Sequence, residues 1–247
     1  MVTILVSGSG TGVGKTRVTA ALARAAARAG KHVQIVKPVQ TGIASGKSSD
    51  ADDAAVLAGI GRGAAHTLRR YPAALAPISA ATAAGLKLNL EDIFREIQQL
   101  PSTDIRLIEG AGGLAAPLFE AGYDWWNFAL QLQVNAVVLV VPDQLGAINQ
   151  ARLVYHYFLK KKDGEIITDW EVRSRSVVKS TSTTKTESIK IPDGGIFLNA
   201  LKAPPPEVAG STRETLADCE VPVWGELATE AIEPRIHQPL AGLLGLA

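Results

Sequence analysis

The first residues that could do chemistry form a glycine-rich segment between an apolar run and a run of helical period. Gly8-Ser-Gly-Thr-Gly-Val-Gly14-Lys15-Thr16 follows the apolar stretch Thr3–Ser7 and leads into Thr16–Ala29. In such a loop the backbone N–H groups converge on phosphate oxygens, the lysine reaches the outer phosphates and the threonine hydroxyl can bind Mg²⁺. The segment therefore predicts a site for a nucleoside triphosphate.

Two other interpretations of this segment have less support. A ligand-free glycine-rich turn would not need Gly-Lys-Thr in register between a strand and a helix. A dinucleotide site would need an acidic residue at the end of the second apolar run, and none stands there. The strict phosphate-loop pattern has a glycine at the position that Ser9 occupies here. The nearest preceding glycine, Gly8, is one residue further from Gly14-Lys15-Thr16.

Two charged residues lie at the ends of later apolar runs. Lys37 follows His32–Val36, where it could neutralise a phosphoryl group or a carbamate; a surface lysine capping a strand is the plainer alternative. Glu109 follows Asp104–Ile108 and is a candidate Mg²⁺ ligand opposite Thr16, because Mg²⁺ takes one or two carboxylates together with phosphate oxygens.

Two helix starts add further candidates. Asp50, Asp52 and Asp53 suit the positive end of a helix, and one of these carboxylates is a candidate for a further role. The segment from Gly146 to Asn149 opens a second helix, whose N-terminal amides could hold a substrate carboxylate. An ordinary polar residue in a first helical turn explains Asn149 equally well.

The elements that must position these residues alternate along the chain. Continuous apolar runs occur at Thr3–Ser7, His32–Val36, Asp104–Ile108 and Ala136–Val141. Runs of helical period occur at Thr16–Ala29, Asn89–Leu100 and Ala147–Leu159, and a strand at Gly195–Asn199, a final helix and a strand at Val221–Trp224 follow. Continuous apolar strands are covered on both faces. We therefore predict one P-loop NTPase-like α/β domain over residues 1–247, a doubly wound, mostly parallel sheet with helices on both faces.

One stretch interrupts this alternation. Lys160 to Asp193 is basic and rich in Ser and Thr. Its flanks, Ile167–Val172 and Ser188–Ile191, alternate as strands do, which suggests a projecting hairpin; simple disorder is an equal alternative. Because the basic residues lack interleaved aromatics, a solvated insertion is favoured over an arm that binds nucleic acid.

Composition narrows the class of protein. In 247 residues, 25 Lys and Arg against 24 Asp and Glu give a net charge of +1, so we expect neither nucleic acid nor an anionic membrane as partner. The single cysteine, Cys219, excludes an internal disulfide framework and favours a reducing compartment. No run of about 18 apolar residues and no leader pattern occurs, so we expect a cytoplasmic protein.

Taken together, the motifs resemble those of the dethiobiotin synthetase family. The resemblance rests on Gly8-x5-Gly14-Lys15-Thr16, Lys37-Pro-Val-x-Thr41-Gly42, Ser49-Asp50, Glu109-Gly-Ala-Gly-Gly113, Leu145-Gly146-x-Ile-Asn149 and Asn199. They occur in the family's order and at about its spacing over nearly the whole chain. The longer Gly8-to-Gly14 spacing resembles that family's loop and explains Ser9.

The resemblance implies a reaction and a set of catalytic residues. The family makes a cyclic urea from 7,8-diaminononanoate, CO2 and MgATP, through a carbamate and a carbamic-phosphoric anhydride. Lys15 and Lys37 would hold the carbamate and the transferring phosphoryl group, and Thr41 would bond near the reacting amine or carbamate. The implied Mg²⁺ ligands are Thr16, Asp50 and Glu109.

The resemblance also implies binding residues and a partner. Those for ATP are Gly12, Val13, Gly14, Lys15, Thr16, Val18, Asn199, Gly225 and Glu226, with Asn199 reading the adenine edge. Those for the diamine substrate are Lys37, Thr41, Glu109, Gly112, Gly146 and Asn149. The family is a homodimer in which the partner's segment from Gly146 to Asn149 closes over the substrate carboxylate.

Several alternatives stay open from the sequence. Because the segment between Lys37 and Asp50 is short, Asp52 rivals Asp50 as the metal ligand. A P-loop amide-forming enzyme would carry a glutaminase domain with a catalytic cysteine, and Cys219 has no such context. A partition-type ATPase switched by nucleotide would place a second lysine early in the loop, where this chain has Gly10.

Overall fold

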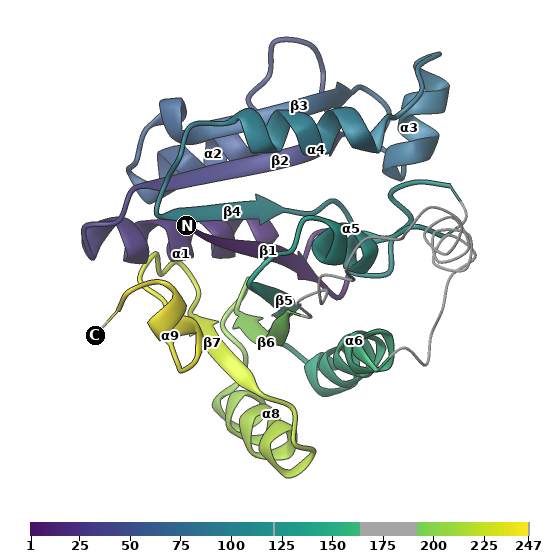
Figure 1. The fold of residues 1–247 in the computed structure, drawn as a ribbon. Helices are drawn as coiled ribbons and strands as arrows, with labels where there is room; N and C mark the ends of the chain where they lie inside the picture. Colours follow the sequence, from purple (N-terminus) through teal and green to yellow (C-terminus); the bar gives the residue numbers. More distant parts are fainter. Residues whose placement is uncertain (121, 164–191, 247) are drawn as a thin grey trace, which may run out of the picture.

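The protein is built on one eight-stranded sheet, seen in a computed structural model that describes residues 1–120, 122–163 and 192–246 (Figure 1). The strand order is β3-β2-β4-β1-β5-β6-β7-β8, and every neighbouring pair is parallel except β7 with β8. The strands are β1 (Val2–Gly8), β2 (Val33–Thr41), β3 (Ala65–Tyr71), β4 (Ile105–Glu109), β5 (Ala136–Pro142), β6 (Asp193–Asn199), β7 (Val223–Leu227) and β8 (Arg235–Ile236). The predicted fold class, α/β with a mostly parallel sheet, is confirmed.

Helices cover both faces of this sheet. They are α1 (Lys15–Arg28), α2 (Asp50–Ala58), α3 (Pro77–Ala83), α4 (Leu90–Gln99), α5 (Trp125–Gln131), α6 (Ala147–Lys162), α8 (Pro206–Asp218) and α9 (Leu240–Leu243), with a 3-10 turn at Arg62–Ala64. Residues of α1, α2 and α9 share one core with the sheet, and residues of α3, α4, α5, α6 and α8 share the other. None of the described helices has the length and apolar character that crossing a membrane requires.

The central strands bury both of their faces. On β1, Leu5 lies in one core, whereas Ile4 and Val6 lie in the other. A strand enclosed in this way is mostly apolar along a continuous run, which is why such a run predicted a parallel sheet.

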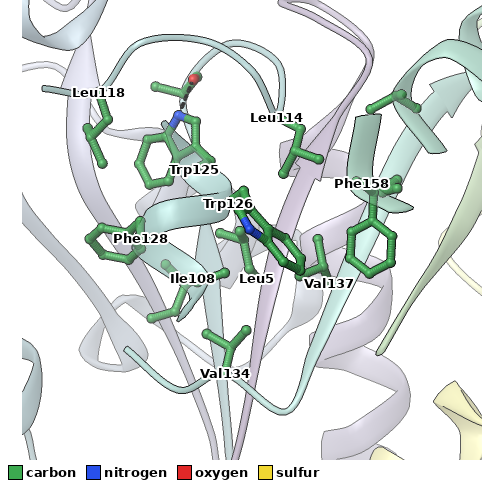
Figure 2. Close-up of a cluster of buried hydrophobic side chains, with 14 of the residues drawn as sticks. Leu5, Ile108, Leu114, Leu118, Trp125, Trp126, Phe128, Val134, Val137 and Phe158 are labelled. Carbon is green, nitrogen blue, oxygen red and sulfur yellow. Dashed lines mark hydrogen bonds between the residues drawn. The ribbon is translucent and has the colours of Figure 1, made fainter. Parts of the chain in front are cut away.

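Helix α5 supplies the bulkiest part of one core. Trp125, Trp126 and Phe128 are fully buried there, in the cluster drawn in Figure 2. The Trp125 indole Nε1 donates to the carbonyl oxygen of Ala111 at 2.7 Å. The helix thereby fixes the glycine-rich connection that follows β4.

Several elements had no sequence prediction, among them β3, α3, α5, β8 and α9. Strand β3 is only half-buried at the edge of the sheet and carries charged side chains such as Arg69 and Arg70, so it lacks an apolar run. Helices α3 and α5 have seven residues each, too few to show a helical period. The strand predicted at Val221–Trp224 begins two residues later, after Pro222, which has no N–H for the sheet.

The basic insertion is described only at its ends. Lys160 and Lys162 belong to the last turn of α6, and Asp193 begins β6. The flanks Ile167–Val172 and Ser188–Ile191, for which a hairpin or disorder was predicted, lie outside the described residues.

A glycine in β6 gives a test of packing. A Cβ on Gly195 would lie 2.4 Å from the Trp224 ring, whereas a Cβ on Gly210, exposed in α8, would meet nothing within 4 Å. Overpacking should make Gly195→Ala less stable by about 1–3 kcal/mol. Gly210→Ala, the matched control, should gain about 0.5–1 kcal/mol because alanine favours helix. Urea unfolding of both variants measures this, and equal effects would contradict the packing account.

Candidate active site

The phosphate loop connects β1 to α1 and depends on one glycine at the helix start. Gly14 caps α1 with φ of 87°, in the left-handed region, and a Cβ there would lie 2.1 Å from the Asn199 Nδ2 atom. Only glycine tolerates both the positive φ and the close approach of Asn199. The next residue, Lys15, is buried and its Nζ donates to the carbonyl oxygen of Gly10 at 2.8 Å. The lysine therefore lies across the loop that should hold phosphates.

A second loop, after β4, packs directly on the phosphate loop. The backbone N–H of Leu114 donates to the Gly8 carbonyl at 2.9 Å. A Cβ on Gly113 would lie 3.2 Å from the carbonyl oxygens of Gly8 and Ser9, so glycine permits this approach. Ser9, the departure noted in the sequence, donates its hydroxyl to Gln150 Oε1 at 2.8 Å and so fastens the loop to α6.

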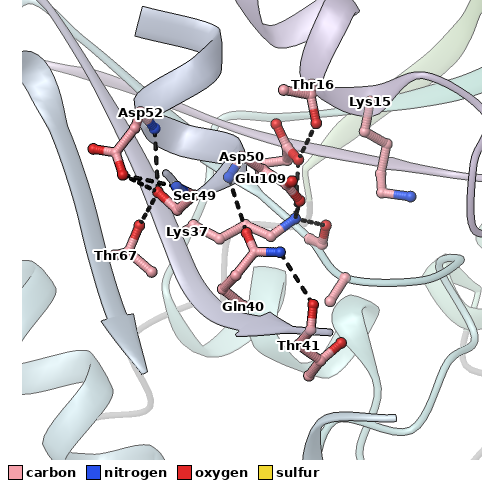
Figure 3. Close-up of polar contacts among 12 residues, drawn as sticks. Lys15, Thr16, Lys37, Gln40, Thr41, Ser49, Asp50, Asp52, Thr67 and Glu109 are labelled. Carbon is pink, nitrogen blue, oxygen red and sulfur yellow. Dashed lines mark hydrogen bonds and ion pairs between the residues drawn. The ribbon is translucent and has the colours of Figure 1, made fainter. Parts of the chain in front are cut away.

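Lys37 lies at the centre of a buried charge cluster (Figure 3). Its Nζ is 2.7 Å from Asp50 Oδ2 and 2.9 Å from Glu109 Oε1, and it donates to the Gly110 carbonyl at 3.0 Å. The sequence placed Lys37 at the end of a strand, but β2 continues to Thr41. Lys37 reaches the site because β2 pairs with the shorter β4 in the register Val36 to Ile108, which sets Lys37 beside Glu109.

Glu109 is fully buried and joins the two halves of the cluster. Its Oε1 accepts from Thr16 Oγ1 at 3.0 Å as well as from Lys37. Its Oε2 has no hydrogen-bond partner among the described residues. A buried carboxylate oxygen without a partner is costly, so this atom points to a ligand that is bound during function.

The structure separates the two rival aspartates. Asp52 Oδ2 accepts from the backbone N–H and the hydroxyl of Ser49, both at 2.8 Å, and pairs with Arg70 at 3.1 Å. Its carboxylate thus completes a capping box at the start of α2. Asp50 instead directs its carboxylate to Lys37, while its backbone N–H donates to Gln40 Oε1 at 3.0 Å. The geometry therefore favours Asp50 over Asp52 as a metal ligand.

The charges in the cluster perturb one another. Burial, together with the neighbouring Lys37 ammonium, lowers the pKa of Lys15 to about 8. Burial also opposes the charge of Lys37, but the carboxylates of Glu109 and Asp50 outweigh it and raise the Lys37 pKa. Lys37 is therefore a fixed cation, whereas Lys15 can lose its proton near neutral pH.

A cavity of about 840 Å³ opens over this cluster. Its lining includes predicted residues from the phosphate loop, β2, α2 and the loop after β4: Gly12, Gly14, Lys15, Thr16, Lys37, Thr41, Asp50, Glu109 and Gly112. A further part of the wall is apolar and comes from the connection between β3 and α3 and from the start of α3, with Ala74, Leu75 and Pro77. The cavity thus combines a phosphate-binding side with a surface suited to an alkyl chain.

Several predicted nucleotide contacts lie outside this cavity. The Val13 carbonyl accepts from Asn199 Nδ2 at 2.9 Å, and Val18 is fully buried in the core beneath the loop. Gly225 lies beneath Phe197, because a Cβ there would be 2.4 Å from that ring. Val18 and Gly225 thus have packing roles, and their contact with a nucleotide stays a prediction. Glu226, the last of the predicted nucleotide contacts outside this cavity, forms an ion pair with Arg213.

Asn199 and Glu226 lie on the far side of the phosphate loop from Lys37. Asn199 is fully buried, and its Oδ1 accepts from Arg17 Nη1 at 2.9 Å. Glu226 pairs with Arg213 at 2.6 Å, and both line a second cavity of about 470 Å³. Sequence reasoning missed Arg17, because its partners are set by the fold and no spacing marks them.

Gly146 and Asn149 are not brought to the Lys37 cluster within one chain. Both are exposed at the start of α6. Gly146 instead borders a small hollow of about 180 Å³ shared with α8. Their predicted contact with the substrate carboxylate of a second copy stays a prediction.

Comparison with known proteins identifies the family to which the chain belongs. A family profile described as "AAA domain" matches residues 2–188. The ATP-dependent dethiobiotin synthetase BioD of Mycobacterium tuberculosis is 44% identical over 155 residues, covering 62% of this chain and 67% of that protein. The chain belongs to the dethiobiotin synthetase family. The synthetase of Rhodococcus erythropolis is 46% identical over 156 residues, covering 60% of this chain and 66% of that protein.

Membership confirms the resemblance seen in the sequence. Like other dethiobiotin synthetases, the protein is an ATP-dependent ligase that forms a carbon–nitrogen bond in biotin synthesis. The interpretations as a partition-type ATPase or a glutaminase-linked amidating enzyme therefore have no support. A solved signal recognition particle receptor FtsY from Elizabethkingia anophelis shares the fold, with a TM-score of 0.52, 15% identity, and coverage of 99% of this chain and 65% of that one.

The lowered pKa of Lys15 gives a pH prediction for this synthetase. A lysine that is partly neutral above about pH 8 must be protonated beside a triphosphate, so binding should take up a proton there. We expect ATP affinity to fall as the pH rises above about 8, with uptake approaching one proton at about pH 9 and little at about pH 6.5. Calorimetry in buffers of different ionisation enthalpy measures this uptake.

The control for this measurement is Lys15→Arg. Arginine stays charged throughout this pH range. In Lys15→Arg the proton uptake that accompanies ATP binding at high pH should therefore be absent, even if the affinity for ATP changes. Equal uptake by Lys15→Arg and the unmodified protein at high pH would contradict the assignment to Lys15.

Proposed function

We propose that this protein closes the cyclic urea of dethiobiotin from 7,8-diaminononanoate, CO2 and ATP. The observation that carries the proposal is the single cavity lined by Lys15, Thr16, Lys37, Thr41 and Glu109. It joins a phosphate loop to a buried cation and an apolar wall. A ligase that couples ATP to a small diamine needs these parts in one place.

The proposed reaction has three steps. One amine of the substrate adds to CO2 and loses a proton, which gives a carbamate. A carbamate oxygen attacks the γ-phosphorus of ATP and ADP leaves, which gives a carbamic-phosphoric anhydride. The second amine attacks the anhydride carbonyl and loses a proton, and phosphate leaves as the ring closes. No protein nucleophile is needed, so positioning and charge neutralisation carry the catalysis.

The lysines and Thr41 then have distinct roles. Lys37 is held as a cation by Asp50 and Glu109 and would neutralise charge on the carbamate and the transferring phosphoryl group. Lys15 would leave its contact with Gly10 and bind the outer phosphates. Thr41 lines the same cavity and would hydrogen-bond near the reacting amine or carbamate.

The residues of the site fit a bound Mg²⁺. Thr16, Asp50 and Glu109 would hold it, because they offer a hydroxyl and two carboxylates, and Glu109 Oε2 has no partner among the described residues. When bound, the ion would offset charge on the phosphate oxygens.

The remaining predictions concern the partner and the location. We propose that the protein is a homodimer in which Gly146 and Asn149 of the second copy approach the substrate carboxylate; their exposure at the start of α6 supports this. A cytoplasmic location and the lack of nucleic-acid and membrane partners stay predictions from composition.

The direct test is product formation. Purified protein with ATP, Mg²⁺, bicarbonate and 7,8-diaminononanoate should yield dethiobiotin together with ADP and phosphate in equal amounts, measured by mass spectrometry. Hydrolysis of ATP without dethiobiotin would overturn the proposed reaction.

Lys37→Ala is the variant that tests the proposed reaction most directly. Lys37→Ala removes the cation beside the reacting groups and should lower kcat by about a thousandfold or more. Nucleotide binding should change little, because Lys15 and the loop amides remain. The matched control is Lys47→Ala, an exposed lysine on the same connection from β2 to α2, which should keep full activity. A Lys37→Ala variant with more than a tenth of normal kcat would contradict the assigned role.

The two aspartates provide a matched pair for the metal. Asp50→Asn should raise the Mg²⁺ concentration for half-maximal binding to the ATP complex by about tenfold. Asp52→Asn should leave it unchanged and cost about 1 kcal/mol of stability, because it weakens the α2 cap. Calorimetric Mg²⁺ titration and urea unfolding give the two readouts, and the reverse pattern would assign the ligand to Asp52.

A further inference from the structure

Gln40, a buried side chain that lines the main cavity, connects the end of β2 to the start of α2 (Figure 3). Its Oε1 accepts from the backbone N–H of Asp50 at 3.0 Å, and its Nε2 donates to the Thr41 carbonyl at 3.2 Å. Asp50 is the first residue of α2, where a backbone N–H has no partner inside the helix. The amide of Gln40 therefore fastens the backbone of Asp50 to the strand that carries Lys37.

The carboxylate of Asp50 depends on its backbone more than that of Glu109 does. The Glu109 side chain is 1% exposed and accepts from both Thr16 and Lys37. The Asp50 side chain is 37% exposed, and within the described part of the chain its carboxylate has one ion pair, with Lys37. Because packing does not enclose this carboxylate, its place in the site follows from where α2 begins.

Two other side-chain contacts hold the start of α2, and both lead to β3. The Ser49 hydroxyl accepts from the Thr67 hydroxyl at 2.6 Å, and the Asp52 carboxylate pairs with Arg70 at 3.1 Å. Strand β3 lies at the edge of the sheet, and β2 separates it from β4. Of these three contacts, the one made by Gln40 is the one that reaches β2 and so sets the start of the helix relative to the site.

We infer that Gln40 is a positioning residue, which keeps the Asp50 carboxylate where it can reach both Lys37 and a bound Mg²⁺. It acts through the backbone N–H of Asp50. Without this acceptor the N–H would turn to water and the first turn of α2 would open more often, so the metal would lose a ligand for part of the time. The inference rests on the proposed function in taking Asp50 as a Mg²⁺ ligand.

The probe is Mg²⁺, titrated calorimetrically into protein that is in excess over ATP. Gln40→Met keeps the length of the side chain but has no strong acceptor for the Asp50 N–H. It should raise the Mg²⁺ concentration for half-maximal binding by about tenfold, close to the effect of Asp50→Asn. A concentration within about twofold of that for the unmodified protein would overturn the inference.

A double variant shows whether the effect passes through Asp50. In Asp50→Asn the carboxylate is already absent, so the addition of Gln40→Met should change the Mg²⁺ concentration by less than about twofold. If the two effects multiply instead, Gln40 acts on the metal by another route and the inference is wrong. A normal Mg²⁺ concentration in Asp50→Asn alone would overturn it as well.

The matched control is Gln34→Met. Gln34 is a second buried glutamine of β2, at the end of the strand away from the site, and its amide bonds to Arg106 at 3.0 Å and to the Pro101 carbonyl at 3.1 Å. Its loss should lower the urea concentration at the midpoint of unfolding but leave Mg²⁺ binding unchanged. An equal weakening of Mg²⁺ binding in both variants would assign the effect to general loosening and contradict a positioning role.

Gln40→Asn keeps the test decisive if Gln40→Met does not fold. Its amide is shorter by one methylene and cannot span to the Asp50 N–H, so it should weaken Mg²⁺ binding in the same direction, and normal binding would overturn the inference. In either variant, exchange of the Asp50 amide hydrogen with solvent, followed by NMR without metal, should be faster by about tenfold or more. Since these measurements need neither diamine nor turnover, their failure is distinct from failure to form dethiobiotin.

Discussion

The buried ammonium of Lys37 is the charge on which the arrangement of the site depends. The carboxylates of Asp50 and Glu109 come from the start of α2 and the end of β4, and each lies within 3 Å of that one cation. Without it, the two negative groups at close range would repel each other. The two ion pairs therefore join β2, α2 and β4 at the site.

The register of the sheet makes this pairing possible. Because Val36 of β2 lies opposite Ile108 of β4, the next residues, Lys37 and Glu109, emerge side by side on the face covered by α1 and α2. A slip of one residue would move Lys37 to the other face of the sheet. The alternation of Ile35 and Val36 between the two cores opposes such a slip, since it would exchange their surroundings. The packing of the two cores thus maintains the register that sets Lys37 beside Glu109.

Sequence reasoning succeeded where residue type and neighbouring pattern determine position together. Lys15 and Thr16 follow the loop after β1 and Glu109 ends β4, and parallel strands end at a common edge, so their approach could be predicted. The choice between Asp50 and Asp52 could not, because a capping box and an acidic ligand look alike in sequence.

Other features depend on contacts that no sequence pattern marks. Arg17 donates mainly to backbone carbonyls, which every residue has, so its partners follow only from the fold. Gly225 was expected at the nucleotide from the family resemblance alone, and this stays a prediction; the structure adds that a side chain there would collide with Phe197. Strand β3 escaped notice because it is half-buried and lacks an apolar run.

The two outermost strands limit how copies of this chain can associate. On β3, Arg69 and Arg70 are engaged with Glu96 and Asp52, and at the opposite border β8 is only two residues long. Neither border offers a long, uncharged row of backbone groups for another strand to join. Edge-to-edge joining of copies through the outermost described strands is therefore disfavoured in the native state.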